Sequence, residues 1–459
     1  MMDHDLIVVG GGAAGLGAVR AALWAAADVA LITDEAPGGD CTFTGCVPSK
    51  TLLAAARDGL GFAEAMARVR STVEHIAATE SAEVLENEGV TVIEGRARLV
   101  THDTVAVEER RITAPRIVVA TGSQPSLPDC IAGLAEAEPL SSETVFDLTG
   151  APESLGIIGG GSTGCELAQA FAAFGTEVTL FEQGPQLLPS EVSEAAALVC
   201  EALGQIGVTV RLDTRVEAVE PAPGGVVAVR TSCRDGAADG APVVCERLLA
   251  ATGRVPATDD LGLDGMRVKF DPHGHVITND RMMTSLRGVY AAGDVTGRAF
   301  LSHAADEMGR IAAGNALGKG LRGRFREATI PRVVFTDPEV ASVGVIPWHA
   351  PPGSRVAYLP LTEVDRAVTD GRTDGFIAIV AGPRRLLRNT GGGRILGATI
   401  VAPRAGEMIQ EIVLAMRTGA FAGRLAQASH AYPTWSNGVQ KAAAQFFGEV
   451  EGRRARRVG

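Results

Sequence analysis

The sequence predicts an α/β protein in which a strand–helix–strand module occurs twice and a C-terminal α+β domain follows. Two observations predict the repeat: an apolar run leads into a Gly-x-Gly-x-x-Gly turn at residues 10–15, and the same pattern returns at residues 159–164. The C-terminal domain is predicted by a change of texture near residue 326, after which alternating apolar stretches indicate an antiparallel sheet. A chain of 459 residues is long enough for several domains.

The first module runs from the apolar strand Leu6–Val9 to a second strand, Val29–Ile32, through an alanine-rich helix. Glycines at these places allow a tight turn, let a pyrophosphate approach the backbone and let the helix pack on the strand. The first turn of the helix supplies N–H groups to the phosphates. The module therefore predicts a dinucleotide site, with contacts from Gly10, Gly12, Ala13, Ala14 and Gly15.

An acidic residue is expected to bind the ribose hydroxyls at this site. Thr33 comes directly after the second strand, and Asp34 and Glu35 follow it. We assign the ribose contact to Asp34.

The second module repeats the first at an offset of 149 residues, the distance from Gly10 to Gly159 (159 − 10). Its second strand, Glu177–Phe181, ends at Glu182. A carboxylate there accepts hydrogen bonds from ribose hydroxyls and repels a 2′-phosphate, so we expect NADH to be preferred over NADPH. The residues predicted to bind this second dinucleotide are Gly159, Gly161, Ser162, Gly164, Glu182 and Gly253.

Two cysteines, Cys41 and Cys46, lie four residues apart between a strand and a helix expected over residues 51–57. A disulfide in so small a ring can open without unfolding its surroundings, which suits a catalytic role better than a structural one. Pro48 fits the first turn of the helix, and a helix start lowers the pKa of a nearby thiol. We therefore expect Cys46 to be an accessible thiolate.

The composition excludes several classes of protein. A net charge of −12 argues against nucleic acid as a partner. Seven scattered cysteines in a long chain do not form the pattern of a secreted disulfide framework. No signal peptide or membrane span is expected, which favours a cytoplasmic protein.

The remaining chain predicts further elements of both kinds. Asp294 stands at the carboxyl end of a short strand that begins near residue 288, where it could bind a chain of hydroxyl groups. The other predicted elements are helices over residues 58–88, 407–418 and 438–447, and strands at 91–93, 104–107, 117–119, 377–380 and 395–401. The apolar C-terminal helices are candidates for a dimer interface.

Taken together, these motifs resemble those of the pyridine nucleotide–disulfide oxidoreductases, which include dihydrolipoamide dehydrogenase, glutathione reductase and mercuric reductase. The motifs cover almost the whole length: Gly10–Gly15, Gly39–Lys50, Gly159–Glu166, Ala251–Arg254, Ala292–Asp294, Phe335–Glu339 and Tyr432–Thr434.

The resemblance implies an FAD domain built from residues 1–150 and 257–325, with an NAD(P) domain inserted at residues 151–256. Residues 326–459 would form the dimerisation domain of a homodimer whose active sites are shared across the dimer. Two Rossmann-like domains and a C-terminal α+β domain are thus the expected fold.

The resemblance also implies a route for electrons, from NAD(P)H through FAD to the Cys41–Cys46 disulfide. Cys46 would face the flavin and Cys41 would attack the substrate, while Lys50 and Glu166 would lie beside the reactive edge of the flavin. Besides the glycine turn and Asp34, the implied FAD contacts are Gly39, Lys50, Thr121, Gly122, Asp294 and Ala304. No metal-binding residues are expected.

Two departures from the family pattern bear on the acceptor. Members that handle dithiols carry a His before the Pro of the last motif and a Glu five residues beyond it, where this chain has Tyr432 and Asn437. A phenol with a pKa of about 10 is a weak base at neutral pH, and mercuric reductases resemble this chain in having a tyrosine there. Ser162 also replaces a bulky residue that often gates the nicotinamide pocket.

The sequence therefore favours a mercuric-reductase-like flavoenzyme, with Tyr432 lining the acceptor site and a metal ion, a quinone or an unusual disulfide as acceptor. The alternative enzyme is dihydrolipoamide dehydrogenase, which would need another base. The alternative of another class is a flavin-binding protein without turnover.

Overall fold

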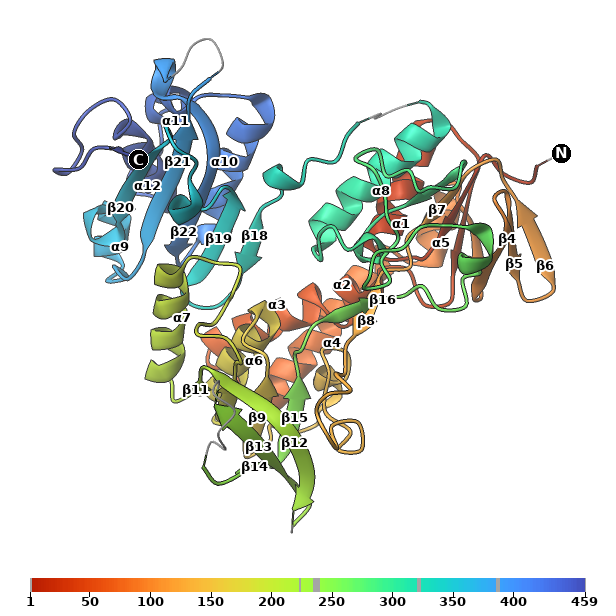
Figure 1. The fold of residues 1–459 in the computed structure, drawn as a ribbon, viewed down its shortest axis with the longest axis horizontal. Helices are drawn as coiled ribbons and strands as arrows, with labels where there is room; N and C mark the ends of the chain where they lie inside the picture. The colour runs from red at the N-terminus through yellow and green to blue at the C-terminus, as the bar shows by residue number, and fades with distance from the viewer. Residues whose placement is uncertain (1, 223, 234–239, 320–322, 385–388, 459) are drawn as a thin grey trace. The chain divides into compact units, whose positions relative to one another are not determined.

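The computed structural model describes residues 2–222, 224–233, 240–319, 323–384 and 389–458. The chain forms two compact units (Figure 1). The first unit comprises residues 1–129, 138–151 and 249–326, and the second comprises residues 130–137, 152–248 and 327–459.

A parallel five-stranded sheet forms the centre of the first unit, in the order β17-β7-β1-β2-β3. Every residue of the strands β1, β2, β7 and β17 is buried, as continuous apolar runs in a parallel sheet require. The strands are β1 (Leu6–Val9), β2 (Val29–Thr33), β3 (Thr91–Glu94), β7 (Ile117–Val119) and β17 (Val289–Ala291).

Two helices from distant parts of the chain, α1 and α8, lie side by side in this unit (Figure 1). Glycines allow them to approach closely, since a Cβ on Gly309 would lie 2.0 Å from the carbonyl oxygen of Ala14. The helices are α1 (Ala13–Trp24), α2 (Gly39–Phe43), α3 (Cys46–Arg57), α4 (Phe62–Ala78), α5 (Ala82–Asn87) and α8 (Ser302–Leu317).

Two small antiparallel sheets complete the first unit. One consists of β4 (Ala97–Thr101), β5 (Thr104–Val107) and β6 (Arg110–Thr113). The other pairs β8 (Ser123–Pro125) with β16 (Arg254–Pro256), which brings Arg254 opposite Pro125.

The second unit contains the repeat of the βαβ module. Its sheet has the order β11-β10-β9-β15, and an antiparallel sheet, β12-β13-β14, follows in the chain. The elements are β9 (Ser154–Ile158), α6 (Ser162–Ala173), β10 (Glu177–Phe181), α7 (Ser193–Gln205), β11 (Thr209–Arg211), β12 (Thr214–Ala222), β13 (Val226–Cys233), β14 (Val243–Cys245) and β15 (Arg247–Ala250).

The C-terminal part of the second unit is built on a six-stranded antiparallel sheet, β18-β19-β22-β21-β20-β23. Helices α10 and α12 supply apolar side chains to its core. The elements are β18 (Arg332–Val334), β19 (Glu339–Gly344), β20 (Arg355–Pro360), α9 (Asp365–Thr369), β21 (Phe376–Gly382), β22 (Arg394–Ala402), α10 (Ala405–Thr418), α11 (Ala422–Gln427), α12 (Trp435–Ala444) and β23 (Arg456–Arg457).

The predicted antiparallel sheet at residues 377–380 and 395–401 is confirmed by β21 and β22. The prediction for the last helix was wrong at both ends: α12 starts at Trp435, not 438, and stops at Ala444. The early start follows from Thr434, whose hydroxyl accepts a hydrogen bond from the Asn437 N–H and so caps the helix.

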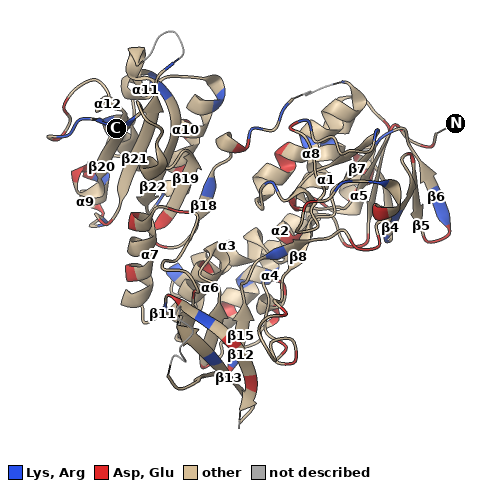
Figure 2. Ribbon diagram, viewed as in Figure 1, with Lys and Arg blue, Asp and Glu red and all other residues tan. Residues whose placement is uncertain are grey.

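Acidic and basic residues are distributed over both units (Figure 2). Within the described ranges, no helix combines the length and the apolar composition needed to cross a bilayer.

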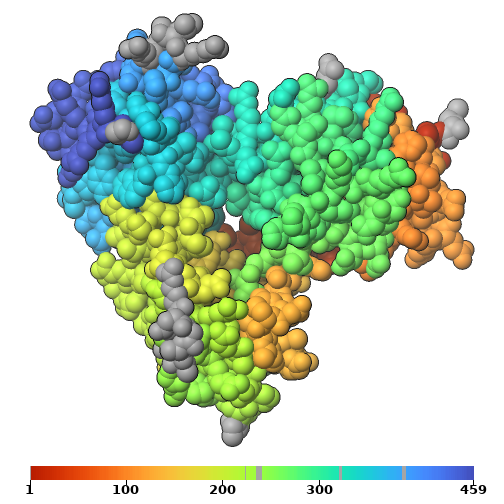
Figure 3. Space-filling view, in the orientation of Figure 1, coloured from red at the N-terminus to blue at the C-terminus, as the bar shows by residue number. Residues whose placement is uncertain are grey.

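A buried carboxylate joins the second module to the C-terminal sheet within the second unit. Glu191, whose side chain is 3% exposed, accepts hydrogen bonds from Arg332 Nε at 3.2 Å and from the Ser342 hydroxyl. Nearby, the Tyr358 hydroxyl donates to Glu194 on α7. In Figure 3 the yellow surface that contains α7 adjoins the blue surface of the C-terminal sheet.

We expect Glu191→Ala to lower the free energy of unfolding by about 1–3 kcal/mol, because Ser342 and Arg332 lose their shared acceptor. Urea denaturation of the purified protein measures the change. Glu201→Ala, on the exposed face of α7, the helix that begins just after Glu191, is the matched control and should change stability by less than about 0.5 kcal/mol. Equal effects of the two substitutions would contradict a stabilising role for Glu191.

Candidate functional site

The glycine turn of the first module is shaped for a phosphate group. Gly10 has φ +104°, and a Cβ on Gly15 would lie 1.9 Å from the Gly10 carbonyl oxygen. Gly12 precedes α1, no side chain caps this helix, and its first turn contains no acidic residue. The N–H groups of the turn therefore face a site that suits an anionic pyrophosphate.

The second module has the same local geometry. Gly161 precedes α6 with φ −75° and ψ −173°, against −75° and −172° for Gly12. A Cβ on Gly164 would lie 1.9 Å from the Gly159 carbonyl oxygen, whereas a Cβ on Gly161 would meet nothing within 4 Å. The backbone is thus open at the position where a pyrophosphate must approach.

Glu182 is held in place at the end of β10. Its two carboxylate oxygens accept hydrogen bonds from the N–H groups of Gly160 at 2.8 Å and Gly184 at 2.7 Å. A carboxylate fixed at this point is oriented for ribose hydroxyls.

In the first module, Thr33 occupies the position that corresponds to Glu182. The N–H of Gly10 donates to the carbonyl of Ile32 at 2.8 Å, as that of Gly159 does to Phe181, so the strands are in the same register. A Cβ on Gly11 would lie 2.9 Å from Thr33 Oγ1, just as one on Gly160 would lie 3.0 Å from Glu182 Oε2.

The side chain predicted for the ribose contact, Asp34, is exposed and follows the end of β2. The ribose contact of Asp34 stays a prediction, and the structure adds Thr33 as a second candidate for that contact. The sequence contained the signal, because subtracting the module offset from Glu182 gives residue 33 (182 − 149).

The two cysteines of the redox motif lie on consecutive helices, Cys41 within α2 and Cys46 at the first position of α3. The backbone of α2 adjoins the glycine turn, since a Cβ on Gly39 would be 2.7 Å from Gly12 Cα. Cys46 is exposed and Cys41 is partly buried. The motif is thus carried directly against the first dinucleotide turn.

Ser302, at the first position of α8, places its hydroxyl 3.5 Å from Cys46 Sγ. The sequence offered no signal for this contact, because the two residues are 256 positions apart. The pKa of the Cys41 thiol is raised by its hydrogen bond with Cys46 and by burial, while Ser302 acts in the opposite direction.

Asp294 lies near the first module, where it accepts a hydrogen bond from the Ser123 hydroxyl at 2.7 Å. Burial raises the pKa of Asp294, and the hydrogen bond with Ser123 opposes that rise. Thr121 donates to the Ala257 carbonyl at 2.7 Å, while Cβ atoms on Gly122 or Gly253 would meet nothing within 4 Å. Ala304 is buried in α8.

The predicted Lys50 and Glu166 fall in different units, Lys50 on α3 and Glu166 on α6. Lys50 donates a hydrogen bond to Ser49 at 3.3 Å. Glu166 is 4% exposed and accepts a hydrogen bond from the Phe335 N–H at 3.0 Å. Their predicted joint role beside a flavin stays a prediction.

Family models decide the identity of the chain. Residues 4–309 match the pyridine nucleotide-disulphide oxidoreductase model, and residues 330–443 match the dimerisation domain of the same family. The chain belongs to this family. It is an FAD-dependent oxidoreductase that uses NAD(P)H and a redox-active disulfide, and its dimerisation domain supports a homodimer.

Relatives of this oxidoreductase differ in their substrates. It is 33% identical to a dihydrolipoyl dehydrogenase of Thermus scotoductus, over 96% of this chain and 97% of the relative. It is 32% identical to a mercuric reductase of Lysinibacillus sphaericus, over 98% of this chain and 83% of the relative.

Solved structures show the same fold over nearly the full length of this oxidoreductase. The Cu(II) complex of the HOCl-induced flavoprotein disulfide reductase RclA from Escherichia coli matches with a TM-score of 0.85 and 27% identity, covering 97% of this chain and 99% of the other. LpdA from Mycobacterium tuberculosis matches with a TM-score of 0.86 and 29% identity, covering 96% and 100%.

In the oxidoreductase, Tyr432 is 71% exposed and lies shortly before α12. The side chain of Asn437 donates to Gln440 Oε1 at 3.0 Å. His430 is held between the Glu411 carboxylate, at 2.9 Å from Nε2, and the Ala428 carbonyl, at 3.0 Å from Nδ1. Burial raises the pKa of Glu411, and its hydrogen bond with His430 opposes the rise.

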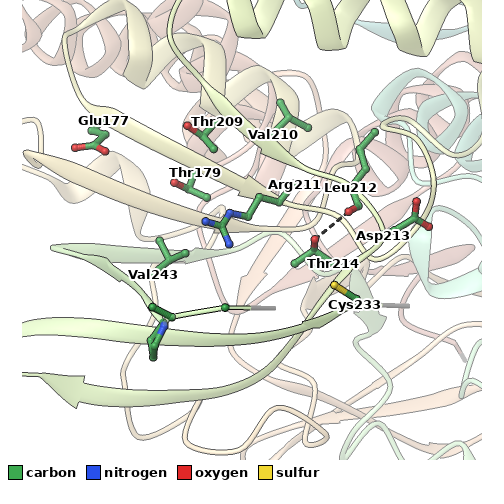
Figure 4. A pocket seen from close by; sticks show the side chains of 13 residues that line it. Glu177, Thr179, Thr209, Val210, Arg211, Leu212, Asp213, Thr214, Cys233 and Val243 are labelled. Atoms are coloured by element: carbon green, nitrogen blue, oxygen red, sulfur yellow. Dashed lines mark hydrogen bonds between the residues drawn. The ribbon is translucent and has the colours of Figure 1, made fainter. Parts of the chain in front are cut away.

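The second unit contains a pocket whose lining includes none of the predicted site residues (Figure 4). It is lined by residues of β10, β11 and their neighbours, among them Thr179, Arg211 and Cys233. Within the described part of the chain, no group of three or more His, Cys, Asp or Glu side chains is placed to bind a metal ion.

We expect Thr33→Val to weaken FAD binding about three- to tenfold, because the substitution removes one hydroxyl and keeps the branched shape. Asp34→Asn should leave the affinity within twofold. Quenching of FAD fluorescence on titration of the flavin-free protein measures both. A larger loss of FAD affinity for Asp34→Asn than for Thr33→Val would indicate that Asp34 makes the ribose contact.

Proposed function

We propose that this oxidoreductase delivers electrons to a soft metal ion or a quinone, and not to a substrate disulfide. The observation that carries the proposal is the identity and setting of Tyr432. A disulfide substrate leaves as two thiols, one of which must take a proton as it departs. A positioned His contributes roughly 10²- to 10⁴-fold to such a step, and a tyrosine is a weak substitute at neutral pH.

The neighbouring side chains do not supply the missing base. The ring of His430 is 9% exposed, and both of its nitrogens have partners in Glu411 and Ala428. The amide of Asn437 is engaged with Gln440 and cannot exchange protons as a carboxylate would.

A soft metal ion places no such demand on the site, since thiolates bind soft metals directly. The similarity to mercuric reductases and to RclA, which has a solved Cu(II) complex, supports a metal acceptor. The balance is simple: NADH and two Cu²⁺ give NAD⁺, two Cu⁺ and a proton, and a single Hg²⁺ takes both electrons.

A quinone is the second acceptor that needs no thiol base. It takes two electrons and two protons, one proton arriving with the hydride of NADH and the other from water. When bound, FAD supplies the two-electron carrier between the nicotinamide and the acceptor. The chain's own residues would hold that carrier through the glycine turn, Thr33 or Asp34, and Asp294.

The proposed function assigns roles to the predicted site residues. Cys41 and Cys46 form the redox pair, Lys50 and Glu166 flank the flavin, and Tyr432 lines the acceptor site from the partner subunit of a cytoplasmic homodimer.

We expect the enzyme to turn over dihydrolipoamide with NAD⁺ at a rate far below the tens per second typical of enzymes. Cu²⁺, Hg²⁺ or a water-soluble quinone should support steady NADH oxidation. Stopped-flow and steady-state absorbance measure both. Rapid dihydrolipoamide turnover by the unmodified protein would instead favour a dihydrolipoyl dehydrogenase, the activity named for the Thermus relative.

The double substitution Tyr432→His with Asn437→Glu should raise dihydrolipoamide turnover at least about tenfold, since it restores the acid–base pair. The matched control is Tyr432→Phe, which removes the hydroxyl without adding a base and should leave dithiol turnover low. If the double substitution does not raise dihydrolipoamide turnover, residues other than Tyr432 and Asn437 limit that turnover.

We also propose that NADH is preferred over NADPH. The fixed carboxylate of Glu182 should favour NADH in kcat/KM by about tenfold or more, and Glu182→Gln should narrow the ratio because it removes the charge that repels a 2′-phosphate. Glu177→Gln, at the exposed start of the same strand, is the control and should keep the ratio. A wild-type preference for NADPH would refute the assignment.

A further inference from the structure

An arginine outside the predicted site joins α2, called the redox helix because it carries Cys41, to Ser123 and Asp294 in the first unit. Arg254 begins β16, and its side chain is 24% exposed. Its guanidinium forms an ion pair with Asp40, and its Nε donates to the Ser123 hydroxyl at 2.7 Å. The same group donates to the Ser123 carbonyl at 2.7 Å and lies 4.0 Å from Asp294.

Asp40 immediately precedes Cys41 in the short helix α2, so its charge is adjacent to the thiol in the chain. Negative charge near Cys41 opposes formation of a thiolate. The charge of Glu80 already acts in this direction, since it raises the pKa of Cys41. The Glu80 carboxylate also accepts a hydrogen bond from Thr42, the residue after Cys41, at 3.0 Å.

Further acidic groups face the ion pair. Burial raises the pKa of Glu143, and the charges of Asp40 and Glu35 raise that pKa further. The charge of Arg254 lowers it. Arg254 is therefore a cation that the observed contacts and charge effects connect to three carboxylates, those of Asp40, Glu143 and Asp294.

We propose that Arg254 is a positioning residue that neutralises Asp40 and anchors α2, and that it thereby keeps the Cys41 thiol reactive. The inference rests on the proposed role of Cys41 as the attacking thiol. Removal of the cation leaves a negative charge beside Cys41, whereas removal of the Asp40 charge leaves a positive one. The two substitutions are thus expected to change thiol reactivity in opposite directions.

The experiment is a double-mutant cycle of Asp40 and Arg254 in the holoenzyme. Each variant is reduced by excess NADH without oxygen and then treated with iodoacetamide at pH 7.5. Peptide mass spectrometry follows Cys41 and Cys46 separately. We expect Asp40→Asn to speed alkylation of Cys41 about threefold or more and Arg254→Gln to slow it by a similar factor. The double substitution should return the rate to within about twofold of wild type.

Two further variants separate charge from structure. Arg254→Lys keeps the cation, so its rate should lie nearer to wild type than that of Arg254→Gln. Asp58→Asn breaks the ion pair between Asp58, directly after α3, and Arg68 on α4, and it should leave the Cys41 rate unchanged. Bound flavin, measured by absorbance, reports whether each variant retains its fold.

Unchanged Cys41 rates in both single variants, or a change in the same direction in both, would overturn the inference. The proposed function has a separate test in the same samples. If the oxidised enzyme contains no Cys41–Cys46 disulfide, the redox pair itself is wrong, whatever the double-mutant cycle shows.

Discussion

The close approach of backbones at glycines is the constraint on which the first unit depends. A side chain at Gly15 would collide with the turn at Gly10, and one at Gly39 would collide with Gly12. Gly309 plays the same part between α8 and α1. These contacts bring a phosphate-binding turn, the redox helix and the helix that carries Ser302 into one small region, because each glycine removes the atoms that would hold two segments apart.

The electrostatics of that region are then set by few groups. Helix N-termini favour anions, yet several acidic side chains interact in this region, among them Asp40, Glu80, Glu143 and Asp294. The positive charge of Arg254 offsets part of this negative charge, through its ion pair with Asp40 and its proximity to Asp294. Arg254 belongs by sequence to the segment predicted for the NAD(P) domain, yet the fold places it in the first unit, beside the redox helix.

The chemistry available to the enzyme follows from which protons can move. A dithiol pair can pass electrons to a metal ion or a quinone without a dedicated base, whereas disulfide exchange requires one. The absence of a His at the position of Tyr432 and the engagement of His430 with Glu411 favour the first kind of reaction. Relatives named for both kinds show that the fold alone does not select between them.

The sequence by itself determined the family, the two βαβ modules and the antiparallel C-terminal sheet, because apolar periodicity and glycine spacing are local properties of the chain. It also contained Thr33 at the module offset. Only the tertiary structure decided the contacts of Arg254 with Asp40, of Ser302 with Cys46 and of Glu166 with Phe335, which join residues 214, 256 and 169 positions apart. Such pairs depend on how whole elements pack, and no local pattern of residues encodes them.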